Sequence, residues 1–298
     1  MKSLLPALLP LVALAAGGSQ VVAKVQVKGE PCGVAGAPGA VWATDAALGR
    51  LVRIDPATNV VTRSFRTDPT PCELRYAAGS LWVVTQSGRV DRFDPASGRR
   101  LASIPVGVTT YDVAYAARSI WVTNRNGGTV QRISPVSNRV LKTVTFPPGA
   151  LPAGIGWAAG AIWVGDDHGR SVYRLDPRTY RVTRVVSGGL GASWIATNGP
   201  DVWVSNTKSG SVSRIDAVRR RLVSTVRTGS SPVNLDVIGG DVWVPDDVDN
   251  TVTRIDGGTG RIVETIPTGK GPAVVAGAEG DVWASMFEDE QVWRIHPG

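Results

Sequence analysis

The sequence predicts an all-β protein, specifically a seven-bladed β-propeller with four antiparallel strands per blade and the last blade closed by the N-terminal strand. One motif, clearest at residues 240–260 (GDVWVPDDVDNTVTRIDGGTG), returns along the chain, each copy centred on a tryptophan: Trp42, Trp82, Trp121, Trp163, Trp203, Trp243 and Trp283. The steps between these tryptophans are 40, 39, 42, 40, 40 and 40 residues. A period near 40 residues built from strand-like segments is typical of propellers.

Each copy contains four short strand signals separated by turn residues. In the sixth copy the first strand is expected at residues 232–238, followed by the tryptophan strand, a Gly/Asn/Asp loop and a third strand that ends in Arg-Ile. A turn such as Asp94-Pro95-Ala96-Ser97-Gly98 leads into a fourth strand elsewhere in the chain. Asp bonds the backbone ahead of it, Pro presets φ and Gly takes a left-handed position, so these turns join antiparallel strands.

The two ends of the chain are expected to meet. The last copy stops at Gly298 after its third strand, and residues 21–31 (VVAKVQVKGEP) match the fourth-strand segment 262–272 (IVETIPTGKGP). The N-terminal strand thus completes the last blade and removes an open sheet edge. The predicted propeller covers residues 20–298, with blades at about 32–66, 72–105, 110–146, 152–186, 192–226, 232–266 and 272–297 plus 20–28.

The N-terminus predicts export. Lys2 precedes an apolar run from Leu4 to Ala16, and Ala13-Leu14-Ala15 gives an A-x-A cleavage pattern, so residues 1–16 are expected to be a secretory signal peptide. The run is shorter than the roughly 20 residues that a spanning helix needs. We therefore expect a periplasmic, cell-envelope or extracellular protein. Its formal charge of +7 permits contact with polyanions without requiring it.

Cys32 and Cys72 each follow a proline and each lie ten residues before a repeat tryptophan. Equivalent positions on neighbouring blades are close together, and an oxidising compartment lets such cysteines pair. A disulfide is predicted, with two buried free thiols as the alternative.

Features present in every copy are expected to be structural. The seven repeat tryptophans should pack between blades, and Trp157 and Trp293 should also pack. One position in the third strand carries an arginine in every copy, where the side chain can pack its stem and bond nearby oxygens. These arginines are Arg53, Arg92, Arg132, Arg174, Arg214, Arg254 and Arg294.

A ligand site needs residues that break the repeat. Such residues are expected near one mouth of the central channel, where the loops of the sixth and seventh copies are rich in acids. Trp194 is the clearest departure from the repeat, because its counterparts in other copies include Gly33, Gly154 and Val274. The predicted ligand-contact region is Glu73, Asp112, Trp194, Asn234, Asp236, Asp246, Asp247 and Glu288.

The repeats resemble the YVTN-type propeller repeat, with Val122-Thr123-Asn124 and Val204-Ser205-Asn206 standing where that motif has Val-Thr-Asn. They are similar also to virginiamycin B lyase-like propellers, whose units share the apolar-Trp strand and the Arg-Ile ending of the third strand. The resemblance covers residues 21–298. It implies the propeller fold but no single activity, because such propellers include binding proteins as well as enzymes.

The resemblance implies two enzymatic alternatives. Virginiamycin B lyases open a lactone with a divalent metal, His and Glu at the channel mouth, but His168 and His296 are expected on opposite sides, so no catalytic residue is predicted here. Gluconolactonase-like propellers hold their metal with Glu, Asn and Asp. The nearest such set, which would suit Ca²⁺ or Mg²⁺, is Glu30, Asn234, Asp236 and Asp246.

Taken together, these patterns favour an exported, monomeric binding scaffold whose site lies at the acid-rich channel mouth. Its partner is an unidentified protein, envelope polymer or small molecule. A metal-dependent lactone-opening enzyme is the alternative. Binding of single-stranded nucleic acid or another polyanion is a further alternative, disfavoured because the basic residues are spread over many turns instead of forming one stripe.

Overall fold

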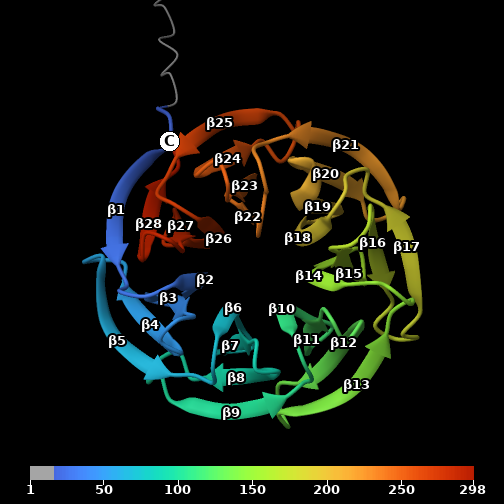
Figure 1. The fold of residues 1–298 in the computed structure, drawn as a ribbon, viewed down its shortest axis with the longest axis horizontal. Coiled ribbons are helices and arrows are strands. Elements are labelled where there is room, and N and C mark those ends of the chain that lie inside the picture. The colour runs from blue at the N-terminus through green and yellow to red at the C-terminus, as the bar shows by residue number, and fades with distance from the viewer. Residues whose placement is uncertain (1–16) are drawn as a thin grey trace, which may run out of the picture.

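The computed structural model describes residues 17–298, and the signal peptide predicted at residues 1–16 lies outside them. The described chain consists of β-strands and one short 3-10 helix, η1 (Thr207–Ser209). Figure 1 shows the sheets arranged in a ring, each with one strand near the centre and one at the rim. Residues 17–298 contain no helix with the length and hydropathy that crossing a bilayer requires.

Four sheets each contain four consecutive antiparallel strands. The first is β2 (Pro31–Ala37), β3 (Ala40–Asp45), β4 (Arg50–Asp55) and β5 (Val60–Arg66). The second is β6 (Pro71–Ala77), β7 (Ser80–Thr85), β8 (Arg89–Phe93) and β9 (Arg100–Pro105). The third is β10 (Thr110–Ala116), β11 (Ser119–Asn124), β12 (Thr129–Ser134) and β13 (Arg139–Thr145). The fourth is β22 (Asp236–Ile238), β23 (Asp241–Asp246), β24 (Thr251–Ile255) and β25 (Ile262–Pro267).

One sheet has eight strands, which differs from the expectation of separate four-stranded units. It contains β14 (Pro152–Ala158), β15 (Ala161–Asp166), β16 (Ser171–Leu175), β17 (Val182–Val186), β18 (Ala192–Asn198), β19 (Asp201–Asn206), β20 (Ser211–Asp216) and β21 (Arg221–Arg227). Its halves are joined by one residue pair, Asp166 with Ala192. Gly165 permits this approach, because a Cβ there would overlap the backbone carbonyl of Ser193.

The chain ends pair in the last sheet, as predicted. The strand β1 (Gln20–Gln26) pairs antiparallel with β28 (Gln291–His296), followed by β27 (Asp281–Met286) and β26 (Pro272–Ala278). In Figure 1 the blue β1 runs along the rim beside the red β28. The start of β1 is anchored to β25, since the Ser19 amide and hydroxyl donate to the Glu264 carboxylate at 3.0 and 2.5 Å.

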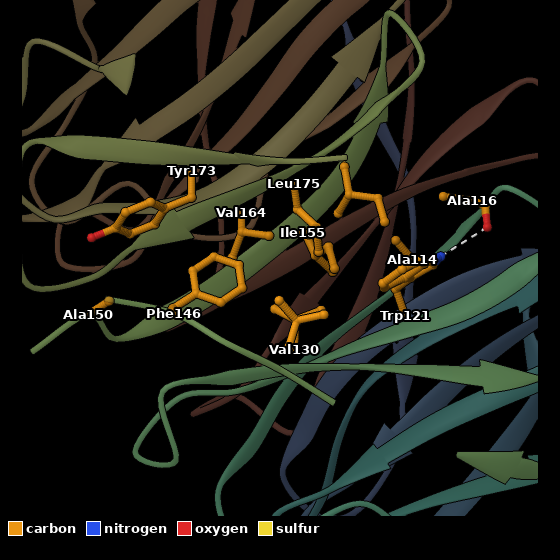
Figure 2. Packing of buried hydrophobic residues seen from close by; sticks show 12 residues of the cluster. Ala114, Ala116, Trp121, Val130, Phe146, Ala150, Ile155, Val164, Tyr173 and Leu175 are labelled. Carbon is orange, nitrogen blue, oxygen red and sulfur yellow. Dashed lines mark hydrogen bonds between the residues drawn. The ribbon is translucent and has the colours of Figure 1, made fainter. Parts of the chain in front are cut away.

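The core lies between neighbouring sheets, and the seven repeat tryptophans are buried in it, which confirms their predicted packing role. Figure 2 shows one such cluster, in which Trp121 donates its indole N–H to the Ala116 carbonyl at 3.0 Å. Five of the repeat arginines place Cζ 5.0–5.6 Å from the ring centroid of the tryptophan in the same sheet. These cation–π contacts explain why tryptophan and arginine recur together.

The predicted disulfide is present. Cys32 in β2 and Cys72 in β6 are bonded, with their Cα atoms 4.9 Å apart. The bond links two neighbouring innermost strands at the end where those strands begin, so it also forms part of the wall of the central channel.

Candidate functional site

The innermost strands β2, β6, β10, β14, β18, β22 and β26 surround the centre of the ring (Figure 1). Three hollows follow one another along this channel. The upper pocket, about 180 Å³, lies where the strands begin and is lined by Cys32, Cys72, Glu73, Tyr111 and Trp194 among others. The middle pocket is about 140 Å³ and the lower pocket, at the opposite opening, about 310 Å³.

Glu73 lies between the upper and middle pockets and lines both. Its side chain comes from β6 and is only 4% exposed. Across the channel, Asn234 donates its amide N–H to Glu73 Oε2 at 2.8 Å. The sulfur of Cys72 lies 4.0 Å from Glu73 Oε1, but a disulfide sulfur carries no proton to donate. Within residues 17–298, therefore, one oxygen of this buried carboxyl group has no hydrogen-bond donor.

Two further carboxyl groups and one guanidinium group lie near Glu73 in the channel. The backbone N–H groups of Val113 and Ile155 donate to the two oxygens of Asp112 at 2.7 and 2.9 Å. Asp236 accepts one bond, from the Val237 N–H at 2.8 Å. Arg75 donates its Nε to the Val113 carbonyl at 3.1 Å. This level of the channel thus gathers three acids around one base.

Burial makes these acids hold their protons more tightly. Burial raises the pKa of Glu73 well above its ordinary value, and the charge of Asp112 adds to the effect against the opposing pull of Arg75. Burial likewise raises the pKa of Asp112 to about 6. The pKa of Asp236 is raised for the same reason. A carboxyl group with a raised pKa gains by taking a cationic or N–H-donating partner, which favours its charged form.

An aromatic pair forms one wall of the upper pocket. The rings of Tyr111 and Trp194 are stacked with centroids 4.8 Å apart, and Arg125 lies 5.7 Å from the Tyr111 ring centroid. Arg125 is ion-paired with Asp167, which also accepts the Ser193 hydroxyl at 2.6 Å. Burial opposes the ionisation of Asp167, but these hydrogen bonds outweigh it and lower its pKa. The network holds the stacked rings in place.

The structure brings together five of the predicted ligand-contact residues. Glu73, Asp112, Trp194, Asn234 and Asp236 all line or border the channel. The predicted region omits Arg75 and Tyr111, which also lie there. Both break the repeat, and most copies have Ala or Gly where Arg75 stands, so the sequence carried a signal for them.

The other predicted residues lie elsewhere. Asp246 is fully buried and accepts the Gly229 N–H at 2.8 Å and the Thr253 hydroxyl at 2.7 Å. Asp247 is half-buried and Glu288 is exposed. Burial, and after it the charge of Glu288, raises the pKa of Asp247.

Several acids of the mouth loops are architectural. Asp45, Asp166 and Asp246 stand three residues after a repeat tryptophan, and each accepts a backbone N–H from the chain entering its sheet. Asp249 and Asp289 likewise accept the N–H groups of Ser230 and Lys270. Many of the acids at the predicted mouth therefore stabilise loops by accepting backbone hydrogen bonds.

The residues present do not fit the predicted metal set. Glu30 is exposed at the start of its sheet and Asp246 is buried within another, whereas Asn234 and Asp236 are in the channel. In the described part of the chain, no three side chains of His, Cys, Asp or Glu come together as metal ligands. His168 is exposed, and His296 Nδ1 lies 2.6 Å from an oxygen of Asp281.

Comparison with known proteins places this chain among propellers. A family described as "Repeat of unknown function (DUF6923)" matches residues 75–234. No curated protein matches the sequence.

Solved structures match over most of their length. A streptogramin B lyase is 14% identical with a TM-score of 0.83, covering 94% of this chain and 98% of its own. Virginiamycin B lyase from Staphylococcus aureus is 16% identical with a TM-score of 0.79, covering 93% and 99%. Kuenenia stuttgartiensis hydrazine synthase is 14% identical with a TM-score of 0.78, covering 90% and 96%. These matches confirm a virginiamycin B lyase-like repeat propeller, and at such identities they show the fold alone.

Proposed function

The chain belongs to the family described as a repeat of unknown function (DUF6923), and from this premise we propose that it is an exported, monomeric propeller that binds a small ligand in the upper pocket. The ligand carries an apolar or aromatic group next to an amine. The role is that of a binding scaffold. Export is supported by the signal-like pattern of residues 1–16 and by the disulfide between Cys32 and Cys72.

The proposal includes seven blades. Five sheets have four strands, and the eight-stranded sheet consists of two four-stranded units, β14–β17 and β18–β21, joined by the single pair of Asp166 and Ala192. Within each unit, neighbouring strands pair over several residues, as in the six pairs between β19 and β20. Counting this sheet as two blades agrees with the seven tryptophan repeats.

The observation that carries the binding role is the combination at Glu73. A buried carboxyl oxygen without a donor borders a pocket whose other walls are the disulfide, the Tyr111–Trp194 stack and aliphatic side chains, together with Gln86 and Thr110. Ligand sites are commonly apolar pockets with a few placed polar groups. An ammonium group would supply the missing donor and would favour the charged form of Glu73, whose pKa burial raises, while an attached ring would lie against the stacked pair.

The contribution of Glu73 to the affinity for an amine can be estimated from the strength of a buried, charged hydrogen bond. Hydrogen bonds to charged groups contribute about 1.5–3 kcal/mol. Losing such a bond should weaken binding by about 10- to 150-fold. The aromatic wall is unaffected by a substitution at Glu73. The affinity for a neutral analogue of the same shape should therefore be nearly the same in the wild type and in the Glu73 variant.

The test uses 2-phenylethylamine and its neutral analogue 2-phenylethanol, titrated calorimetrically into the wild-type protein, Glu73→Gln and the rim control Glu288→Gln. We expect the amine to bind the wild type and Glu288→Gln at least about tenfold more tightly than the alcohol. Glu73→Gln should lose this preference. Equal binding of both probes to all three proteins, or binding of neither probe, would overturn the proposal.

A further inference from the structure

The opposite opening of the channel carries a second group of aromatic side chains. Tyr76, Tyr115 and Trp157 come from the consecutive innermost strands β6, β10 and β14, and all three line the lower pocket of about 310 Å³. Tyr115 is 42% exposed and Trp157 is 36% exposed. The packing role predicted for Trp157 is therefore wrong, because the side chain borders an open pocket.

Tyr115 and Trp157 leave part of their ring surface open at the pocket, whereas Tyr76 also packs against the hydrophobic cluster that contains Trp42 and Leu74. In residues 17–298, none of the three rings stacks on another ring or lies under a cation, and their hydroxyl and indole N–H groups make no hydrogen bond. Trp293 shows the contrast, since Lys24 lies 3.9 Å from its ring centroid and its Nε1 donates to Gln291 at 2.8 Å. Trp157 thus differs from Trp293, because its side chain is partly exposed at the pocket.

The aromatic residues occupy only one side of the opening. The corresponding positions on the other innermost strands are Gly36, Thr197, Val237 and Gly277. Bulky rings thus stand on three neighbouring strands and smaller side chains on the remaining four, which leaves space facing the rings. Repeat packing does not require this asymmetry.

The lower pocket is also lined by hydrogen-bond donors and by hydrogen-bond acceptors. Arg75 and Asp236 line it together with Thr197. The two terminal nitrogens of Arg75 have no hydrogen-bond partner in the described chain, and only one oxygen of Asp236 accepts a bond. The pocket therefore offers free donors from a guanidinium group and a free acceptor from a carboxyl group.

We propose that the lower pocket binds a sugar ring, such as the terminal residue of an oligosaccharide. A sugar ring presents C–H groups on its faces, which pack on aromatic rings, and hydroxyl groups on its edge that both donate and accept. Neighbouring hydroxyls can therefore bond Arg75 and Asp236 at once. The volume of about 310 Å³ falls at the lower end of the range of small-molecule pockets, which suits one ring.

A nucleic acid suits this pocket less well. Bases also stack on aromatic side chains, but each nucleotide carries a negatively charged phosphate group. Asp236 lines the pocket, and Asp112 and Glu73 lie deeper in the channel with one arginine among them. A neutral polyhydroxyl ligand avoids the repulsion between phosphates and these acids.

The test titrates maltohexaose, cellohexaose and chitohexaose into wild-type protein, Trp157→Ala and Trp194→Ala. Trp194 is the matched control, because it is a half-buried tryptophan at the other opening of the same channel. We expect at least one oligosaccharide to bind the wild type at millimolar concentration. Trp157→Ala should weaken this binding by about tenfold or more, as loss of an aromatic contact predicts. Trp194→Ala should leave it unchanged.

Trp157→Ala should unfold thermally close to the wild type, since Trp157 is partly exposed. Trp194→Ala loses its stack on Tyr111 and should unfold at a lower temperature, so the titrations are made below both transitions. Binding of none of the three oligosaccharides would overturn the proposal. Equal weakening by both substitutions would also overturn it. Oligothymidine is titrated in parallel, and Trp157-dependent binding of oligothymidine without sugar binding would overturn the proposal as well. The outcome is separate from that of the amine titration, which depends on Glu73 in the upper pocket.

Discussion

Replacing Asp112 by Asn should change how the stability of the protein depends on pH. Asp112 is 4% exposed, and burial raises its pKa from 3.8 to about 6. The folded protein therefore keeps this proton over a pH range in which the unfolded chain has released it. Because the folded state binds more protons there, the free energy of unfolding is highest below the unfolded pKa and falls as the pH rises through the folded pKa.

The magnitude follows from the shift. Each unit of pKa difference corresponds to about 1.36 kcal/mol, so a shift from 3.8 to about 6 gives about 3 kcal/mol. The substitution also has a cost that is independent of pH. Asn offers one acceptor oxygen where the N–H groups of Val113 and Ile155 bond two, so one buried N–H loses its partner at a cost of about 1–3 kcal/mol.

Urea unfolding of the wild type and Asp112→Asn at a series of pH values between about 4 and 7 measures the effect. The stability of the wild type relative to the variant should decrease by about 2.4 kcal/mol across this range, because part of the shift is already lost at pH 4. Asp94→Asn is the control, since Asp94 lies in an exposed turn where backbone hydrogen bonds from Ser97 lower its pKa. That substitution should change the pH dependence in the opposite direction. Parallel curves for the wild type and Asp112→Asn would refute the reasoning.

Two further predictions concern how the ring is held together. Replacing both Cys32 and Cys72 by Ser should lower the free energy of unfolding by about 4 kcal/mol, because the bond joins residues 40 apart; equal urea midpoints for the variant and the oxidised wild type would contradict this. Removing residues 17–26, which include β1, should expose the outer edge of β28 and cause association. Light scattering measures this, and a deletion variant that stays monomeric and folded would argue against the role of β1 in closure.

Much of the fold could be predicted because each repeat is a local pattern. The tryptophan period, the turn residues and the incomplete last copy led to antiparallel strands and to closure by β1, which the structure confirms. The disulfide was predictable for a related reason. Cys32 and Cys72 hold equivalent positions one repeat apart, so their separation depends only on how neighbouring sheets pack.

The candidate site was only partly predictable. The cluster of acids in the neighbouring loops predicts Asp246 in the site, yet its position three residues after the tryptophan is polar in most copies, with Asp45, Asn124 and Asn206 among the counterparts. Position within the repeat, which indicates a structural role, was a better guide than local charge. Trp157 shows the converse error, since a residue outside the repeat pattern was assigned to packing.

The sequence by itself determined the repeat unit, the closing strand, the cysteine pair and the residues that break the pattern, because all of these depend on spacing along the chain. Only the tertiary structure decided which of those residues meet. Glu73 and Asn234 are 161 residues apart, and they form a hydrogen bond because closure of the ring places their strands across one channel. The spacing of repeats does not specify whether a side chain points into that channel or bonds a loop. Packing and burial decide this, and they separate Glu73 in the channel from Asp246 in its loop.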